Sequence, residues 1–161
     1  MKTLLAASAI AALVVSGVAS ADGGTSCASA QEVFSHGTYI GDTSTSTNFI
    51  GAFGGLPSPG PDLAFKFTAS EGSPLGPIFV TIVGGWNAGA VITATCAGNA
   101  GNPISAATGT TAFQIPTNAL TPGQLYYFYI TGNPSDNSGP SGAFNFIGGV
   151  LPVTLEQFSV E

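Results

Sequence analysis

Residues 124–131 read QLYYFYIT and give a clear strand signal. Aromatic and β-branched residues of this kind favour strands. Alternation along an extended chain divides its apolar side chains between two faces: Leu125, Tyr127 and Tyr129 on one, and Tyr126, Phe128 and Ile130 on the other. Because a strand of a sandwich normally has one polar face, the second apolar face needs cover. A neighbouring loop, the C-terminal segment or a ligand stacked on exposed tyrosines could supply it.

The pattern on both sides of this strand is regular from Tyr39 onward. Apolar or alternating runs are separated by clusters of Gly, Pro, Asn, Asp and Ser, which indicates an all-β sandwich or barrel. Helical periodicity is limited to a turn or two in Cys27–Val33. The expected turn-rich connections are Gly51–Pro61, Ala97–Ser105 and Gly132–Gly142. The expected strands are Thr38–Asp42, Leu63–Thr68, Ile78–Val83, Ala90–Cys96, Thr111–Ile115, Gln124–Thr131, Ala143–Ile147 and Leu151–Val160. About eight short strands favour a two-sheet β-sandwich.

The last of these strands, in residues 150–161, has a distinct pattern. Apolar residues alternate from Leu151 to Leu155 and change parity before Phe158, so a bulge is expected near Glu156 and Gln157. We expect this strand to complete the sandwich. The alternatives are a sorting signal and a strand donated to another subunit.

Length and charge exclude several classes of protein. The chain has 161 residues, and Lys2 and Lys66 are its only basic residues, against eight acidic ones. This length allows one ordinary domain. Nucleic acids and anionic lipids bind clustered Lys and Arg, so we expect no nucleic-acid partner.

The N-terminus has the pattern of a cleaved signal peptide. A basic start at Lys2 precedes an apolar stretch, which ends at Ala19-Ser20-Ala21. The apolar stretch is shorter than the ~20 residues that cross a bilayer, so we expect no membrane span. The expected organisation is a signal peptide over 1–21 and a single domain over 22–161. The protein would then be secreted, periplasmic or displayed at the cell surface.

Export bears on the two cysteines, Cys27 and Cys96. In an oxidising compartment, a pair left alone tends to form a disulfide. Such a bond would close a long loop and contribute roughly 4 kcal/mol in the chain-entropy model. The alternatives, a cysteine nucleophile or a metal pair, lack partners, because the chain has one His.

Several segments occur in a notable order: CASA at 27–30, GTYIGDT at 37–43, PDLAFKF at 61–67, LTPG at 120–123, YYFYITG at 126–132 and SGAF at 141–144. In this order they resemble the bacterial pre-peptidase C-terminal (PPC) domain, over about residues 27–147. That family is a secreted, jelly-roll-like β-sandwich attached to extracellular peptidases. The resemblance implies a jelly-roll-like fold, paired cysteines and no catalysis by the domain itself.

The chain departs from this family where some relatives bind calcium. Trp86-Asn87 stands where such domains often have an Asp, and the neutral residues 97–102 replace an acidic cluster. Calcium needs several carboxylate or carbonyl oxygens together. We therefore expect no metal and no cofactor, with calcium disfavoured.

Few residues offer catalytic chemistry. The only histidine, His36, has no G-x-S-x-G nucleophile motif to serve, so we interpret it as a surface or turn residue. Four carboxylates, at Asp42, Asp62, Glu71 and Asp136, are of the type that a glycosidase uses. They are scattered among turns, and we expect Asp42 and Asp62 to anchor loops through backbone hydrogen bonds.

Trp86 is the candidate residue for ligand stacking, together with Tyr127 and Tyr129. The glycines around Trp86, in the sequence GGWNAG, would allow a flat ligand such as a sugar ring to approach. The alternative is a tryptophan that closes one end of the core.

These observations favour a secreted, non-catalytic binding or accessory module for an extracellular glycan or protein. An alternative is a structural subunit that assembles at the cell surface through its C-terminal strand. The scarcity of lysine favours this alternative, because lysines protect edge strands from pairing with other chains. A small secreted hydrolase is the least favoured hypothesis.

Overall fold

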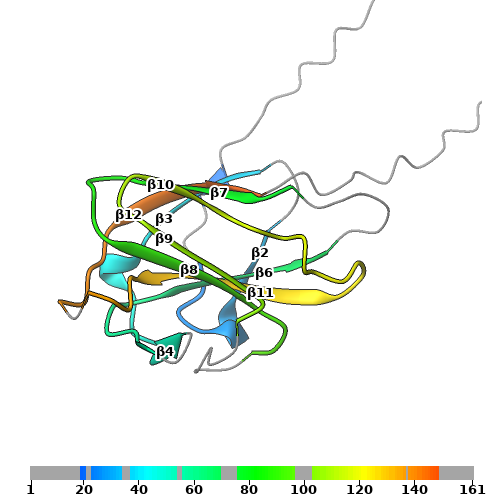
Figure 1. The fold of residues 1–161 in the computed structure, drawn as a ribbon, viewed down its shortest axis with the longest axis horizontal. Helices are drawn as coiled ribbons and strands as arrows, with labels where there is room; N and C mark the ends of the chain where they lie inside the picture. Colours follow the sequence, from blue (N-terminus) through cyan, green and yellow to red (C-terminus); the bar gives the residue numbers. More distant parts are fainter. Residues whose placement is uncertain are drawn as a thin grey trace, which may run out of the picture.

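The computed structural model describes residues 19–20, 23–33, 37–53, 56–69, 76–96, 103–136 and 138–148. In these ranges two five-stranded sheets form a sandwich, and a two-stranded hairpin lies beside them (Figure 1). The predicted all-β sandwich is confirmed. A search of the same ranges finds no helix of the length and apolarity needed to span a membrane.

Each sheet combines strands that are distant in sequence. Sheet A has the order β1 (Ala19–Ser20), β3 (Thr38–Asp42), β12 (Ala143–Ile147), β7 (Ile78–Ile82) and β10 (Ala112–Ile115). Sheet B has the order β2 (Gln31–Glu32), β6 (Leu63–Thr68), β11 (Leu125–Gly132), β8 (Ala88–Thr93) and β9 (Ser105–Gly109). The remaining elements are the hairpin strands β4 (Ala52–Phe53) and β5 (Leu56–Pro57) and the 3-10 turns η1 (Cys27–Ser29) and η2 (Thr43–Thr45).

The eight longest described strands are β3 and β6 to β12. If these eight strands are numbered in chain order, strands one, eight, three and six (β3, β12, β7 and β10) lie side by side in sheet A. The second, seventh, fourth and fifth lie side by side in sheet B. This is the strand order of a jelly roll, the double-sheet arrangement of eight strands. The jelly-roll-like sandwich is therefore confirmed, and its eighth strand ends at Ile147.

The predicted strand positions agree closely where apolar residues alternate. β3, β6 and β12 have the predicted bounds, β7 and β10 differ from them by one residue at one end, and β11 is shifted by one residue at both ends. The prediction of a strand over Ala90–Cys96 is wrong at both ends, since β8 covers Ala88–Thr93. The Thr93 hydroxyl donates to the carbonyl of Thr95 at 2.9 Å, so the chain bends before Cys96.

Two predicted connections contain strands. Ser105, placed at the end of the connection Ala97–Ser105, begins β9, which pairs with β8. Its sequence, SAATG, consists of small residues without an apolar alternation, so only pairing reveals it. The connection Gly51–Pro61 contains the hairpin β4–β5. The predicted strand Leu151–Val160 lies outside the described residues.

The main core lies between the two sheets and is rich in aromatic rings. The rings of Phe65 and Phe146 have centroids 4.9 Å apart at an interplanar angle of 71°, and those of Phe128 and Phe146 are 5.1 Å apart at 74°. These edge-to-face contacts are the geometry that aromatic pairs prefer. Tyr126 and Ile130 join the same cluster, so this face of β11 points into the sandwich.

Candidate functional site

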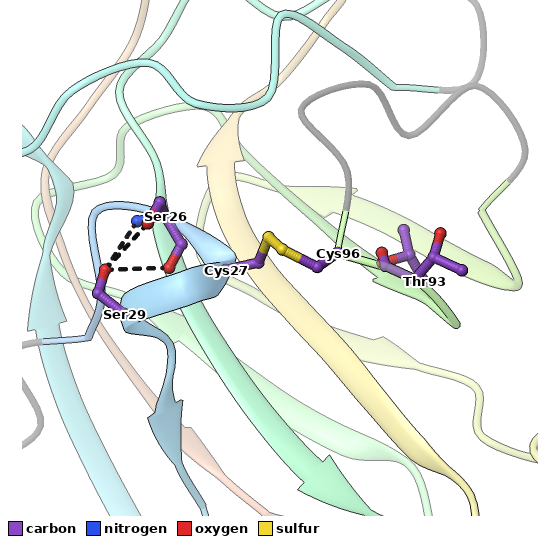
Figure 2. The surroundings of a disulfide bond; sticks show 6 residues. Ser26, Cys27, Ser29, Thr93 and Cys96 are labelled. Carbon is purple, nitrogen blue, oxygen red and sulfur yellow. Dashed lines mark hydrogen bonds between the residues drawn. A yellow bond between two sulfur atoms is a disulfide. The ribbon is translucent and has the colours of Figure 1, made fainter.

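The predicted disulfide between Cys27 and Cys96 is confirmed, with a Cα–Cα distance of 5.4 Å. Cys27 belongs to η1, which contacts β6, whereas Cys96 follows β8, and β11 lies between these two strands. The bridge therefore crosses β11, as Figure 2 shows. In η1 the Ser29 hydroxyl donates to the carbonyl of Ser26 at 3.1 Å. The disulfide holds this turn against sheet B and is compatible with an extracellular or periplasmic protein.

The chain itself covers the second face of β11. A second apolar cluster forms there from six buried residues: Cys27, Ala30, Ile50, Ala64, Val91 and Tyr129. Tyr129 has no exposed surface, and its ring stacks at 6.3 Å on that of Phe49, in the loop after η2. Tyr127 is partly buried beside this cluster. A neighbouring loop is thus the cover found among the described residues, and the Tyr129 ring is inaccessible to a ligand.

A buried carboxylate anchors this covering loop. Asp62 is 1% exposed. Its Oδ2 accepts hydrogen bonds from the backbone N–H of Phe49 at 2.7 Å and from that of Ile50 at 2.5 Å. The Ser46 hydroxyl donates to the backbone carbonyl of Asp62. These contacts confirm the loop-anchoring role predicted for Asp62.

The Asp62 carboxylate is held in an unfavourable environment for its charge. Burial raises its pKa from 3.8 to about 6, against smaller lowering effects from the nearby Thr131 hydroxyl and the N–H groups of Ile50 and Phe49. The Thr131 hydroxyl pairs with that of Ser58 at 2.8 Å, and no group in the described ranges hydrogen-bonds to Oδ1 of Asp62. A raised pKa often marks a catalytic acid. Here the carboxylate has almost no exposure, so we interpret it as structural.

Two other candidate carboxylates, Asp42 and Asp136, serve turns. Asp42 Oδ1 accepts from the backbone N–H of Ser44 at 2.8 Å, and its hydrogen bonds to Ser44 lower the pKa of Asp42. Asp136 Oδ1 accepts from the Ser138 hydroxyl at 2.6 Å, and Ser138 likewise lowers the pKa of Asp136. The predicted turn role of Asp42 is confirmed. Glu71 and His36 lie outside the described residues.

Trp86 closes one end of the main core. Its indole Nε1–H donates to the backbone carbonyl of Ala143 at 2.9 Å, and the side chain packs partly buried against the core cluster. A Cβ atom on Gly142 would lie 2.5 Å from Cδ1 of Trp86, so this glycine packs directly against the ring. The contacts favour the core-closing interpretation of Trp86, because they cover part of its ring.

The residue after Trp86 is part of a polar cluster. The Asn87 Oδ1 accepts from the Asn133 amide at 2.9 Å, and the Asn87 amide donates to Asp136 Oδ2 at 3.3 Å. Asn87 therefore ties the turn after β11 to the start of β8. Across the described ranges there is no group of three or more His, Cys, Asp and Glu residues that could hold a metal ion.

The outer face of sheet A differs from all these regions in its exposed apolar residues. Phe79 is 46% exposed, Ile147 is 48% exposed and Ile40 is 46% exposed. Strand register places four side chains in one row across the sheet, here called the outer row: Gln114, Phe79, Ile147 and Thr38. Ile40 lies in the next row, opposite Asn145. The outer row thus has two apolar side chains between two uncharged polar ones.

Two shallow depressions border the Gln114 end of the outer row. One has a volume of about 250 Å³ and is lined by Pro77, Gln114, Pro116, Thr117 and Asn118. The other has a volume of about 170 Å³ and is lined by Phe79, Val80, Thr81, Ala112, Phe113 and Gln114. Gln114 belongs to both, and neither contains a charged residue.

Trp86, Tyr127 and Tyr129 were the predicted stacking residues, and the exposed aromatic Phe79 was not among them. A usable signal exists in IFVTI, residues 78–82. If Ile78 and the alternate residues face the core, Phe79 must point outward. The run is almost wholly apolar, which obscured this alternation.

The arrangement offers binding chemistry more than proton transfer. The described carboxylates in the candidate acid set are tied to backbone or hydroxyl donors, whereas the outer row is uncharged and exposed. Such a surface binds through ring contacts and through hydrogen bonds of amide and hydroxyl groups. No protein-family model, no curated protein and no solved structure matches this chain.

Proposed function

We propose that this protein is a secreted, non-catalytic binding module that attaches to an extracellular glycan through the outer face of sheet A. The observation that carries the proposal is the exposure of Phe79 in a row that also contains Gln114 and Thr38. An aromatic ring stacks on the apolar face of a sugar, and amide and hydroxyl groups hydrogen-bond its hydroxyls. The outer row runs across four neighbouring strands, so it could contact several units of an extended polymer.

Three further features support this role. The N-terminal pattern favours export, and the Cys27–Cys96 disulfide is compatible with it. An uncharged outer row fits a neutral glycan better than a phosphorylated one. The resemblance to PPC domains favours an accessory role without catalysis.

Binding to insoluble polysaccharides tests the proposal. The mature protein, residues 22–161, is mixed with cellulose, chitin or xylan, and the protein that sediments with each polymer is measured. We expect Phe79→Ala to weaken binding about tenfold, which corresponds to about 1.4 kcal/mol. Leu125→Ala is the matched control, because Leu125 is a comparably exposed apolar residue of sheet B, at 42%.

Three outcomes contradict parts of the proposal. Failure of the unaltered protein to bind any of these polymers would exclude the glycan and favour a protein target. Equal binding by Phe79→Ala and Leu125→Ala would move the site away from the outer row. Release of soluble sugar from the polymers would replace a binding module by a hydrolase.

We also propose that the module folds without calcium, because neutral residues stand at 87 and 97–102. A chelator should leave the melting temperature unchanged. A decrease of more than ~4 °C, equivalent to about 1 kcal/mol in a domain of this size, would reject this part of the proposal.

A further inference from the structure

The edge of sheet A at β3 is occupied in an unusual way. On one side, all five residues of β3 pair with β12. On the other side, β3 pairs in parallel with only the two residues of β1, Ala19 and Ser20, which lie opposite Tyr39 and Ile40. β1 belongs to the segment 1–21 that we expect to be removed on export. Removal of that segment would leave β3 as an unpaired edge strand.

We propose that in the mature protein this edge of β3 binds the C-terminal segment Leu151–Val160 of a second copy as an added strand. The proposal rests on the export proposed above, because β1 leaves the edge only when residues 1–21 are removed. It names a second interaction surface, distinct from the outer row.

The backbone of β3 has hydrogen-bonding groups available at this edge. The N–H of Thr43 donates to the carbonyl of Gly142, on the β12 side. Because backbone groups alternate between the two sides of a strand, odd-numbered residues here face β12. The even-numbered residues, Thr38, Ile40 and Asp42, therefore direct their N–H and C=O groups to the edge, and of these groups the Asp42 carbonyl already accepts from the Thr45 hydroxyl at 3.5 Å. An unpaired row of this kind is a template for another strand.

The sequence of β3 gives this edge little protection against strand addition. Its five residues, TYIGD, include no Lys, Arg or Pro, and the one charged side chain, Asp42, stands at the end of the strand and accepts a hydrogen bond from the N–H of Ser44. The exposed side chains of Ile40 and Ile147 lie on the outer face beside the edge. An added strand with apolar side chains would contact Ile40 directly as a cross-strand neighbour.

The segment Leu151–Val160 has the composition that such an edge accepts. Its ten residues exceed the five of β3, and apolar residues alternate from Leu151 to Leu155. Pro152 falls at its beginning, where a strand tolerates proline. The eight strands of the jelly roll are complete at Ile147, so the fold does not require this segment as one of them.

The topology favours a segment from another copy over the chain's own. The chain leaves β12 beside the start of β3, where Gly148 donates its N–H to the carbonyl of Gly37. To reach the free edge, the same chain would have to cross the connection that leads from β2 in sheet B into β3. Connections at one end of a sheet do not normally cross. A second copy has no such constraint.

The donor segment and the acceptor edge are different parts of the chain. Association through them is therefore heterologous, and it either continues head to tail or closes by reciprocal exchange into a dimer. Both arrangements give a mass above that of the monomer.

Light scattering after size-exclusion chromatography, over a wide dilution series, tests the proposal on residues 22–161. We expect oligomers that dissociate on dilution. Ile40→Pro should abolish them, because it removes an edge-facing N–H and leaves every β3–β12 hydrogen bond intact. Ile40→Ala retains the N–H and should still associate. The truncated chain 22–148, which lacks the donor segment, should be monomeric.

Mixing two variants gives the sharpest test. Ile40→Pro keeps the donor segment and loses the acceptor edge, whereas the chain 22–148 keeps the edge and loses the donor. Each should be monomeric alone, and the mixture should form a one-to-one complex. This result also requires both variants to be folded.

Several results would overturn the proposal. The mature protein could stay monomeric at every concentration, or the two variants could fail to combine. A monomer that melts at a lower temperature after truncation would show that the segment packs within its own chain. Because Phe79 lies outside the edge, loss of glycan binding in Phe79→Ala with unchanged association would separate the two proposals. N-terminal sequencing of the exported protein tests the removal of residues 1–21 separately.

Discussion

Tyr129 and Phe79 lie on opposite sides of the sandwich, and both point away from the main core. Tyr129, on sheet B, has no exposed surface, whereas Phe79, on sheet A, is 46% exposed. The difference comes from the connections between strands. The long connection from β3 to β6, which includes β4, folds over the side of sheet B that faces away from sheet A (Figure 1). An outward aromatic residue is therefore structural on sheet B and available for binding on sheet A.

Loss of the disulfide, which lies on the covered face of sheet B, should cause the largest decrease in stability. We expect Cys27→Ser combined with Cys96→Ser to destabilise the protein by about 4 kcal/mol, because the unfolded chain is no longer constrained over a long loop. Urea denaturation measures the change, and reduction of the unaltered protein is the control. Thiol titration of the unfolded, unreduced protein should find no free thiol, and two thiols per chain would contradict the bond.

Replacement of Tyr129 and of Phe79 by alanine compares the outer faces of the two sheets directly. We expect Tyr129→Ala to cost about 3–4 kcal/mol, because it leaves a cavity under the covering loop. Phe79→Ala should change stability by about 0.5 kcal/mol or less, because its side chain is exposed. Urea denaturation of both variants provides the measurement. Similar losses from both would mean that something also covers sheet A.

Asp62 should make the anchoring of the covering loop depend on pH. Its folded pKa of about 6 lies above the ordinary value of 3.8, so the folded state binds the proton more tightly than the unfolded state. Its contribution is therefore fully present below pH 3.8 and is lost as pH rises to about 6, by at most about 3 kcal/mol. Asp42 and Asp136 have lowered pKa values, so their contributions are lost below this window.

Asp62→Asn should remove that dependence. Urea midpoints measured at about pH 4 and about pH 7 give the comparison. From about pH 4 to about pH 7, the unaltered protein should lose more stability than the variant does, because the amide that replaces the carboxyl group does not titrate. The same pH dependence in both proteins would show that another group is responsible.

Trp86→Phe should have a smaller effect on stability than loss of the disulfide or of the Tyr129 ring. The change removes the hydrogen bond from the indole N–H to the Ala143 carbonyl and retains an aromatic ring, at a cost of about 1 kcal/mol. Circular dichroism is the appropriate probe, because Trp86 is the only tryptophan. If Trp86→Phe kept the melting temperature of the unaltered protein but no longer bound glycan, the binding site would be at Trp86 and not at Phe79.

The strands that were predicted correctly have a common property. In β3, β6 and β12, apolar and aromatic residues alternate or run together between turn residues, so local sequence marks both ends. β9 was missed because its small residues are extended only by pairing with β8. The loop-anchoring roles of Asp42 and Asp62 were predicted from turn chemistry, although the burial of Asp62 was not.

The candidate site was harder to predict than the strands. Trp86 was predicted as a binding residue from its ring and its neighbouring glycines, and Tyr127 and Tyr129 from their place on a second apolar face of one strand. Exposure depends instead on what lies over each residue. Phe49 covers Tyr129 from 80 positions away in the sequence, a distance over which no local pattern acts.

Local sequence was enough to predict that this protein is all-β, where most of its strands lie and which side chains share a face of each strand. Strand propensity and alternation are local properties, so they can be read along the chain. Three features depended on the folded arrangement of the strands: which face of each strand meets the core, which outer face is covered, and which edge pairs only with a two-residue strand. Those outcomes depend on contacts between residues far apart in the chain, such as Asp62 with the loop at Phe49 and β1 with β3.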